Sequence, residues 1–145
     1  MGVSSALDIG ANVGWFTINL SLMGVSTVAV ESFPKYSRVL AYAIAKLKLK
    51  NTGVLMLRVA PETVSLLPNA DCVLFMSVWH HMVRDNGFDR ATALLREIWQ
   101  RSNKLLIFET GQREMPPSFN LPAMEPTAKE WILAYLSSQC AHSQF

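Results

Sequence analysis

The residues with the clearest potential for chemistry form a glycine turn near the start of the chain, within the run Leu7-Asp8-Ile9-Gly10-Ala11-Asn12-Val13-Gly14-Trp15-Phe16. Apolar residues precede the turn and a helical pattern follows it, which predicts a strand, a turn and a helix. Gly10 allows backbone angles that other residues avoid, and Gly14 allows a close approach of backbone or ligand. Asn12 tolerates the left-handed region and offers an amide. A ligand is therefore expected at the start of this helix.

More polar side chains stand where other predicted strands end. Glu31 closes the second apolar stretch, Glu109 closes the fifth, and Ser77 with the pair His80 and His81 follows the fourth. The carboxyl ends of parallel strands share one edge of a sheet, which is where α/β folds bind ligands. This distribution is the main physical argument for a binding cleft.

Strand and helix patterns alternate along the chain. Continuous apolar runs, rather than alternating ones, indicate strands buried on both faces of a sheet. The fold expected is α/β, a doubly wound, mainly parallel five-stranded sheet with helices on both faces. The predicted strands are 6–9, 27–30, 54–59, 72–76 and 104–108. The predicted helices are 15–22, 34–47, 88–99 and one that follows a capping box at 127–130, while 62–67 makes at most a helical turn and 112–126 is an irregular loop.

The glycine turn resembles the first motif of class I S-adenosylmethionine-dependent methyltransferases, a Rossmann-like family with the pattern hydrophobic-Asp-hydrophobic-Gly-x-Asn/Gly-x-Gly. Asp8, Gly10, Asn12 and Gly14 match it. The rival pattern is the dinucleotide-binding G-x-G-x-x-G, in which Asn12 and Trp15 would replace the second and third glycines. A tryptophan is expected to obstruct the helix–strand approach that the third glycine permits. The turn therefore favours S-adenosylmethionine over NAD.

The resemblance implies how the cofactor would be held. Glu31 would accept hydrogen bonds from both ribose hydroxyls, the alternative being a solvated strand end. Phe33 would pack on the adenine face or act as a hydrophobic staple. An acidic residue after the third strand often meets the adenine amino group, and Glu62 is the candidate. The backbone near Ser77 would face the methionine part.

Candidates for catalysis follow the fourth and fifth strands. His80 and His81 resemble a His-His pair found after this strand in many small-molecule methyltransferases, where one could orient substrate or act as a general base. A structural role or one beside the cofactor stays open for the pair. A metal site is not expected, because adjacent histidines point differently and a third ligand is missing. Glu109 would face the substrate or cap the next loop, whereas Trp79 and Met82 suit the cleft wall or core.

Composition sets further limits. The 145 residues suit one domain, 1–145, and 50% of them are hydrophobic, which is enough for a core. The net charge of +2 and the lack of a long basic run give no support for nucleic-acid binding. No apolar run approaches the ~18 residues of a membrane helix. Cys72 and Cys140 are isolated, which favours a reducing, cytoplasmic location.

The resemblance covers about residues 7–109. Family members usually carry helices before the first strand and two more strands after the last helix, so the chain is expected to be trimmed at both ends: a minimal member, a fragment, or a protein that borrows parts from a partner. The fifth strand would then be an exposed apolar edge, which predicts a homo-oligomer through this edge or by exchange of residues 112–145. The function expected is methyl transfer to an oxygen, nitrogen or carbon nucleophile on a small molecule. The alternatives are a non-catalytic interaction module and an NAD-dependent oxidoreductase.

Overall fold

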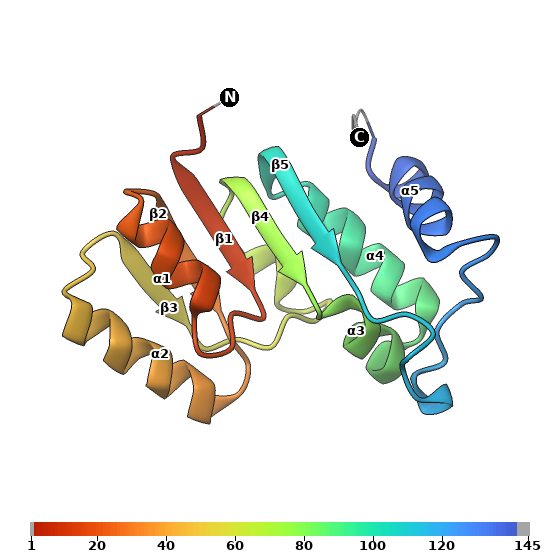
Figure 1. Ribbon diagram of the computed structural model, residues 1–145, viewed down its shortest axis with the longest axis horizontal. Helices are drawn as coiled ribbons and strands as arrows, with labels where there is room; N and C mark the ends of the chain where they lie inside the picture. Colours follow the sequence, from red (N-terminus) through yellow and green to blue (C-terminus); the bar gives the residue numbers. More distant parts are fainter. Residues whose placement is uncertain (1, 142–145) are drawn as a thin grey trace.

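A five-stranded sheet forms the centre of the computed structural model, which describes residues 2–141 (Figure 1). Its order is β3-β2-β1-β4-β5, and every neighbouring pair is parallel. The strands are β1 (Ser5–Ile9), β2 (Ser26–Val30), β3 (Thr52–Leu55), β4 (Ala70–Met76) and β5 (Ser102–Glu109). The chain leaves β1 toward β3 on one side and returns to build β4 and β5 on the other. The predicted parallel sheet is confirmed, and its order reverses between β1 and β4.

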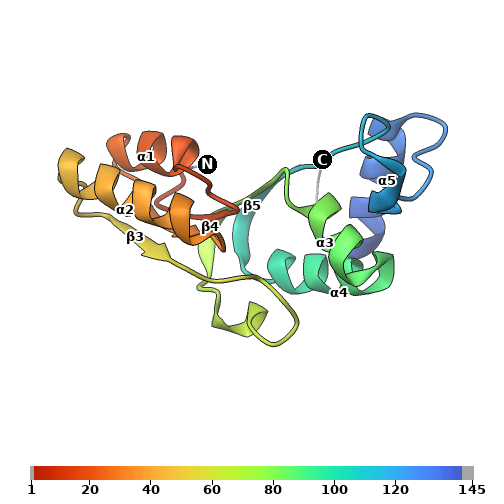
Figure 2. The same ribbon diagram turned by 90° about the horizontal axis from the view of Figure 1, so that it is seen from below.

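Helices cover both faces of the sheet, as predicted. The α-helices are α1 (Trp15–Leu22), α2 (Pro34–Leu47), α3 (Trp79–Asn86), α4 (Phe88–Trp99) and α5 (Ala128–Gln139), and the 3-10 turns are η1 (Val64–Leu66) and η2 (Pro117–Phe119). Figure 2 shows α1 and α2 on one face and α4 with η1 on the other. Within residues 2–141, no helix has both the length and the apolar character needed to cross a membrane.

The core follows the alternation of side chains along the strands. On the α4 side, Leu7 and Ile9 of β1 join Val73 and Phe75 of β4 in the largest apolar cluster. Residues between them on the strands point to the opposite face, where Cys72 packs in a smaller cluster beside α1. Burial on both faces explains why these strands read as continuous apolar runs.

One predicted strand differs from the structure, and one helix of the structure was not predicted. The third strand is earlier and shorter than 54–59, because β3 pairs with β2 over Thr52–Leu55 and is followed by one further backbone hydrogen bond, from the Leu57 N–H to the Glu31 carbonyl at 3.3 Å. Helix α3 was not predicted at all. It has eight residues, and the left-handed Gly87 separates it from α4, so its apolar side chains are too few to show a helical period.

The C-terminal helix is held by its cap and by aromatic packing. Thr127 Oγ1 accepts a hydrogen bond from the Glu130 backbone N–H at 3.2 Å, which confirms the predicted N-cap. Trp131 and Tyr135 stack with ring centroids 4.8 Å apart, and the Tyr135 ring lies 5.3 Å from that of Trp79 in α3. Trp79 is fully buried, so it belongs to the core. These contacts tie α5 to α3, so the long segment 110–126 is anchored at both ends.

Strand β5 forms one edge of the sheet among residues 2–141, and its two outward apolar side chains, Leu105 and Ile107, are 44% and 40% exposed. Unpaired backbone on an apolar edge favours pairing with a second copy. We expect light scattering at micromolar concentration to give twice the 16.2 kDa of one chain. Ile107→Lys should return the protein to one chain's mass, whereas Val39→Lys on the exposed face of α2 should not. A folded 16.2 kDa wild-type monomer would show that the edge is protected within the chain.

Candidate functional site

A cleft opens at the carboxyl edge of the sheet, beside the point where the strand order reverses. It has a volume of about 580 Å³, within the range of small-molecule sites. Six of the residues singled out from sequence line it: Gly10, Asn12, Glu31, Phe33, Ser77 and His81. The fold therefore brings together the ends of β1, β2 and β4, as the sequence predicted for a ligand cleft.

Asp8 acts behind the cleft rather than in it. Its buried carboxylate accepts hydrogen bonds from Thr17, at 3.2 Å from the backbone nitrogen and 2.6 Å from the hydroxyl. Burial raises the pKa of Asp8, and the bonds from Thr17 oppose that rise. The side chain thereby joins the end of β1 to the first turn of α1, which fixes the loop between them.

The loop needs its glycines. Gly10, Asn12 and Gly14 have φ values of 79°, 51° and 89°, all in the region that favours glycine or asparagine. A Cβ on Gly10 would lie 2.3 Å from Val78 Cγ2, and one on Gly14 would lie 2.1 Å from Leu40 Cδ1. Gly10 is thus pressed against the segment after β4, whereas Gly14 is pressed against α2.

Trp15 does not obstruct the approach of the helix to the strands. Its side chain is 72% exposed and points away from the core, so the steric argument against a dinucleotide loop was wrong. The close approach is made one residue earlier, at Gly14. The preference for S-adenosylmethionine over NAD depends on the rest of the motif.

Glu31 is held in place by the backbone around it. Its Oε2 accepts from the Asn12 N–H at 2.8 Å, and its Oε1 accepts from the Phe33 N–H at 2.7 Å. Each carboxylate oxygen has a second lone pair, so both can accept one more hydrogen bond. Phe33 is exposed, and its ring tilts against Tyr36 with centroids 5.3 Å apart. Glu31 is therefore a fixed acceptor beside an exposed aromatic surface.

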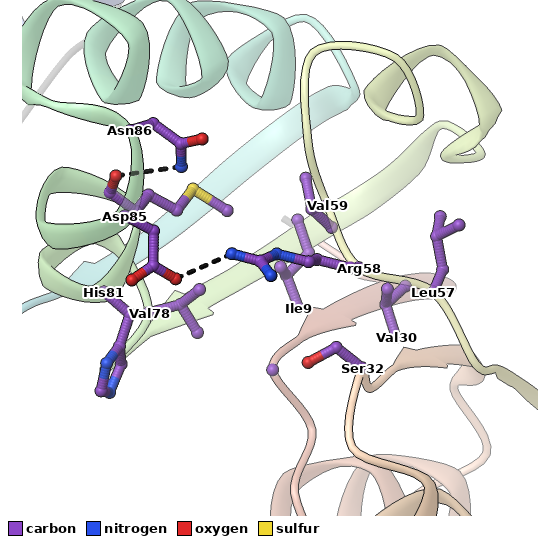
Figure 3. Close-up of a pocket in the computed structure, with 12 residues that line it drawn as sticks. Ile9, Val30, Ser32, Leu57, Arg58, Val59, Val78, His81, Asp85 and Asn86 are labelled. Carbon is purple, nitrogen blue, oxygen red and sulfur yellow. Dashed lines mark hydrogen bonds and ion pairs between the residues drawn. The ribbon is translucent and has the colours of Figure 1, made fainter.

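An ion pair crosses the inner part of the cleft. Arg58, after β3, reaches Asp85 of α3 with a 2.9 Å contact (Figure 3). Arg84 binds the other oxygen of the same carboxylate at 2.7 Å. The same ion pair lines a hollow of about 110 Å³, whose walls also include the apolar side chains of Ile9 and Met82. Sequence reasoning missed this ion pair, because Arg58 was assigned to a strand and its partner is far along the chain.

The two histidines have different surroundings. His80 is buried, and its Nδ1 accepts a hydrogen bond from the Gly111 N–H at 2.8 Å. His81 lines the cleft, with its ring centroid 4.4 Å from that of His80. Burial lowers the pKa of both, with a further lowering from His81 on His80 and from Arg84 on His81. Both rings are thus neutral near pH 7, and a neutral imidazole can accept a proton.

The remaining candidates lie in two places. Ser77, with φ at 56°, donates its hydroxyl to the Glu109 carboxylate, and its N–H donates to the Glu109 carbonyl at 3.0 Å. Glu109 is exposed. Its carboxylate is linked to the cleft by the hydrogen bond from Ser77, which is one of the lining residues. Glu62 is not brought to the cleft: the turn at Pro61 directs it into a separate hollow with Arg90. The structure thus leaves the adenine end of the expected site without the carboxylate that the resemblance suggested.

Comparisons with known proteins identify the fold. Neither a protein-family model nor a curated protein sequence matches the chain. Solved structures do match: the bifunctional kinase-methyltransferase WbdD at TM-score 0.71 and 20% identity, over 81% of this chain and 27% of WbdD, and monomeric WbdD at 0.76 and 21%, over 97% and 34%. The N-terminal domain of EvdMO1 with SAH bound matches at 0.59 and 24%, over 72% and 42%. The chain thus has a methyltransferase fold and spans less than half of each of these structures.

Proposed function

We propose that this chain binds S-adenosylmethionine in the cleft and transfers its methyl group to an oxygen, nitrogen or carbon nucleophile on a small molecule. The observation that carries the proposal is the Glu31 carboxylate, fixed by two backbone N–H groups beside the Gly10 to Gly14 turn, with both oxygens still able to accept. This is the arrangement that a ribose with two adjacent hydroxyls requires. The SAH-bound state of EvdMO1 supports the same choice of cofactor.

The residues present fit such a cofactor. Glu31 would bind the ribose, Phe33 would cover one face of the base, and the Gly10 and Asn12 backbone would lie beneath the nucleoside. Ser77 would border the amino-acid part. When bound, the cofactor supplies an electrophilic methyl group on a sulfonium. The chain's contribution is then mostly to hold two reactants in line and keep water away.

His81 is the candidate for proton transfer, because it lines the cleft and its lowered pKa keeps it neutral. It would accept the proton from the nucleophile as the new bond forms. Glu109 would face the methyl acceptor, with its carboxylate held at the end of β4 by the hydrogen bond from Ser77. His80, the third candidate, is not among the residues that line the cleft, and its ring packs against that of His81.

A cofactor-binding module without catalysis is the second candidate function. Two of the three catalytic candidates are engaged within the chain, Glu109 by Ser77 and His80 by Gly111. A methyl-transfer assay with the methyl acceptor separates the two functions, because only the enzyme would methylate it. A cytoplasmic location is part of the proposal, and the buried Cys72 thiol supports it.

Replacing Glu31 tests the site. Glu31→Ala should weaken binding of S-adenosylhomocysteine by about tenfold or more in calorimetry, because hydrogen bonds to charged groups contribute about 1.5–3 kcal/mol. Glu62→Ala is the matched control: it also removes a carboxylate, but in a separate hollow. Equal affinities for wild type and Glu31→Ala would remove Glu31 from the site. A loss confined to Glu62→Ala would contradict the proposed cleft.

A further inference from the structure

We propose that His80 is a positioning residue that fastens the segment Thr110–Phe119 to α3, and that His81 is the histidine that meets the acceptor. The second half rests on the proposed function, since it gives His81 a substrate. The first half stands on contacts within the chain. It matters because this segment follows β5 directly and packs, through Phe119, against His81, which lines the cleft.

The fastening begins at the imidazole. The Gly111 N–H donates to His80 Nδ1 at 2.8 Å, and Thr110 Oγ1 lies 3.3 Å from the same nitrogen. His80 and Gly111 are both buried, and the side chain of His80 comes from α3, 31 residues earlier. Breaking this bond would leave a buried N–H without its acceptor, which is costly.

The fit around the ring is close. A Cβ on Gly111 would lie 2.5 Å from Met115 Sδ and 3.2 Å from His80 Nδ1. A side chain at position 111 would have to displace Met115 and would press on the imidazole. Gly111 is therefore closely packed between these two side chains and does not lie loosely over the helix.

The far end of the segment returns to the same helix. Phe119 is buried, with its ring centroid 5.7 Å from that of His80 and 5.5 Å from that of His81. The Arg84 guanidinium lies 5.0 Å from the Phe119 ring centroid, in a cation–π contact. Both ends of Thr110–Phe119 thus contact α3, and the segment in turn packs against His81.

The hydrogen bond assigns separate tasks to the two rings. Because Nδ1 of His80 accepts from Gly111, its proton lies on Nε2, and Nδ1 cannot take up a proton without losing the bond. The groups that face it are His81 and Arg84, which lower its pKa together with burial, and Glu109 and Glu114, which raise it. The pKa of His80 in the folded protein is below the ordinary histidine pKa. The hydrogen bond from Gly111 is therefore kept at a pH above the ordinary pKa, and it is lost as the pH falls through the folded pKa.

Hydrogen exchange at the Gly111 amide tests the fastening. His80→Leu should speed exchange of Gly111, after correction for intrinsic rates, by about tenfold or more. His80→Asn should restore protection, because its Oδ1 can take the place of Nδ1 as acceptor. His81→Leu is the matched control and should leave the Gly111 amide protected. Unchanged protection in His80→Leu, or failure of His80→Asn to protect better than His80→Leu, would overturn the proposal.

The wild-type protein supplies a test that does not depend on the folding of a variant. Protection of Gly111 should fall as the pH drops below the ordinary histidine range, and in His80→Asn it should not. In protein that stays folded, wild-type protection that does not fall below the pH at which the His80 ring takes up its proton would contradict the role of His80.

Binding of S-adenosylhomocysteine separates this inference from the proposed function. If the wild type binds the ligand, His80→Asn should bind it with the same affinity, because His80 does not line the cleft. A tenfold loss in His80→Asn would make His80 part of the binding site and overturn the division of roles. If the wild type does not bind, the proposed function fails, while the exchange experiments still decide whether His80 fastens the segment.

Discussion

Saturating S-adenosylhomocysteine should raise the melting temperature of this protein by about 5 to 10 °C. A ligand that binds only the folded state adds RT ln(1 + [L]/Kd) to the free energy of unfolding, which is about 2.7 kcal/mol at a hundredfold excess over Kd. For a domain of this size, each kcal/mol shifts the midpoint by about 2 to 4 °C. The physical basis is the pre-formed cleft, in which Gly10, Asn12 and Glu31 already stand together.

The same melting experiment, run with S-adenosylhomocysteine and with NAD, distinguishes the rival cofactors. Tryptophan fluorescence follows unfolding directly, because Trp79 is fully buried in an aromatic cluster. NAD at the same concentration is the control, since it shares the adenosine and lacks the amino-acid part. A larger shift with NAD would favour an oxidoreductase. No shift with either ligand at millimolar concentration, in folded protein, would contradict the proposed function.

Local features of the fold could be predicted from the sequence. The boundaries of α1 follow from the glycine turn, and those of α2 follow from Pro34 at its first turn and from an apolar face that ends at Leu47. The parallel sheet follows from apolar strands without alternation. Each of these depends on residues close together in the chain, where side-chain type and spacing decide the structure.

Features that depend on distant residues could not be predicted. The Arg58–Asp85 ion pair forms only because the segment after β3 meets α3 at the cleft, and nothing in either local stretch marks it. The separate roles of His80 and His81 depend on the return of Gly111, which adjacent positions in a sequence cannot show. Glu62 was assigned from a family pattern, and the turn at Pro61 sends it elsewhere.

The second prediction with a large effect concerns Gly14. It has a φ of 89°, and Leu40 Cδ1 occupies the place where a Cβ would be, at 2.1 Å. A residue with a side chain there would incur the left-handed penalty of about 1–2 kcal/mol and would also displace Leu40. Leu40 is fully buried between α2 and the sheet, so it cannot move without disturbing its neighbours.

Gly14→Ala should therefore lower the free energy of unfolding by about 2–5 kcal/mol, the sum of the backbone strain and about 1–3 kcal/mol of overpacking. Gly24→Ala is the matched control, because its φ is 88° and nothing lies within 4 Å of its Cβ position, so it should lose only the strain. Urea unfolding of both variants isolates the steric part as their difference. Adding Leu40→Ala to Gly14→Ala should make the pair less destabilising than the sum of the two single changes, since the clash then disappears. Equal losses in Gly14→Ala and Gly24→Ala would show that the turn and α2 do not touch at this point, and that Gly14 is required for its backbone angles alone.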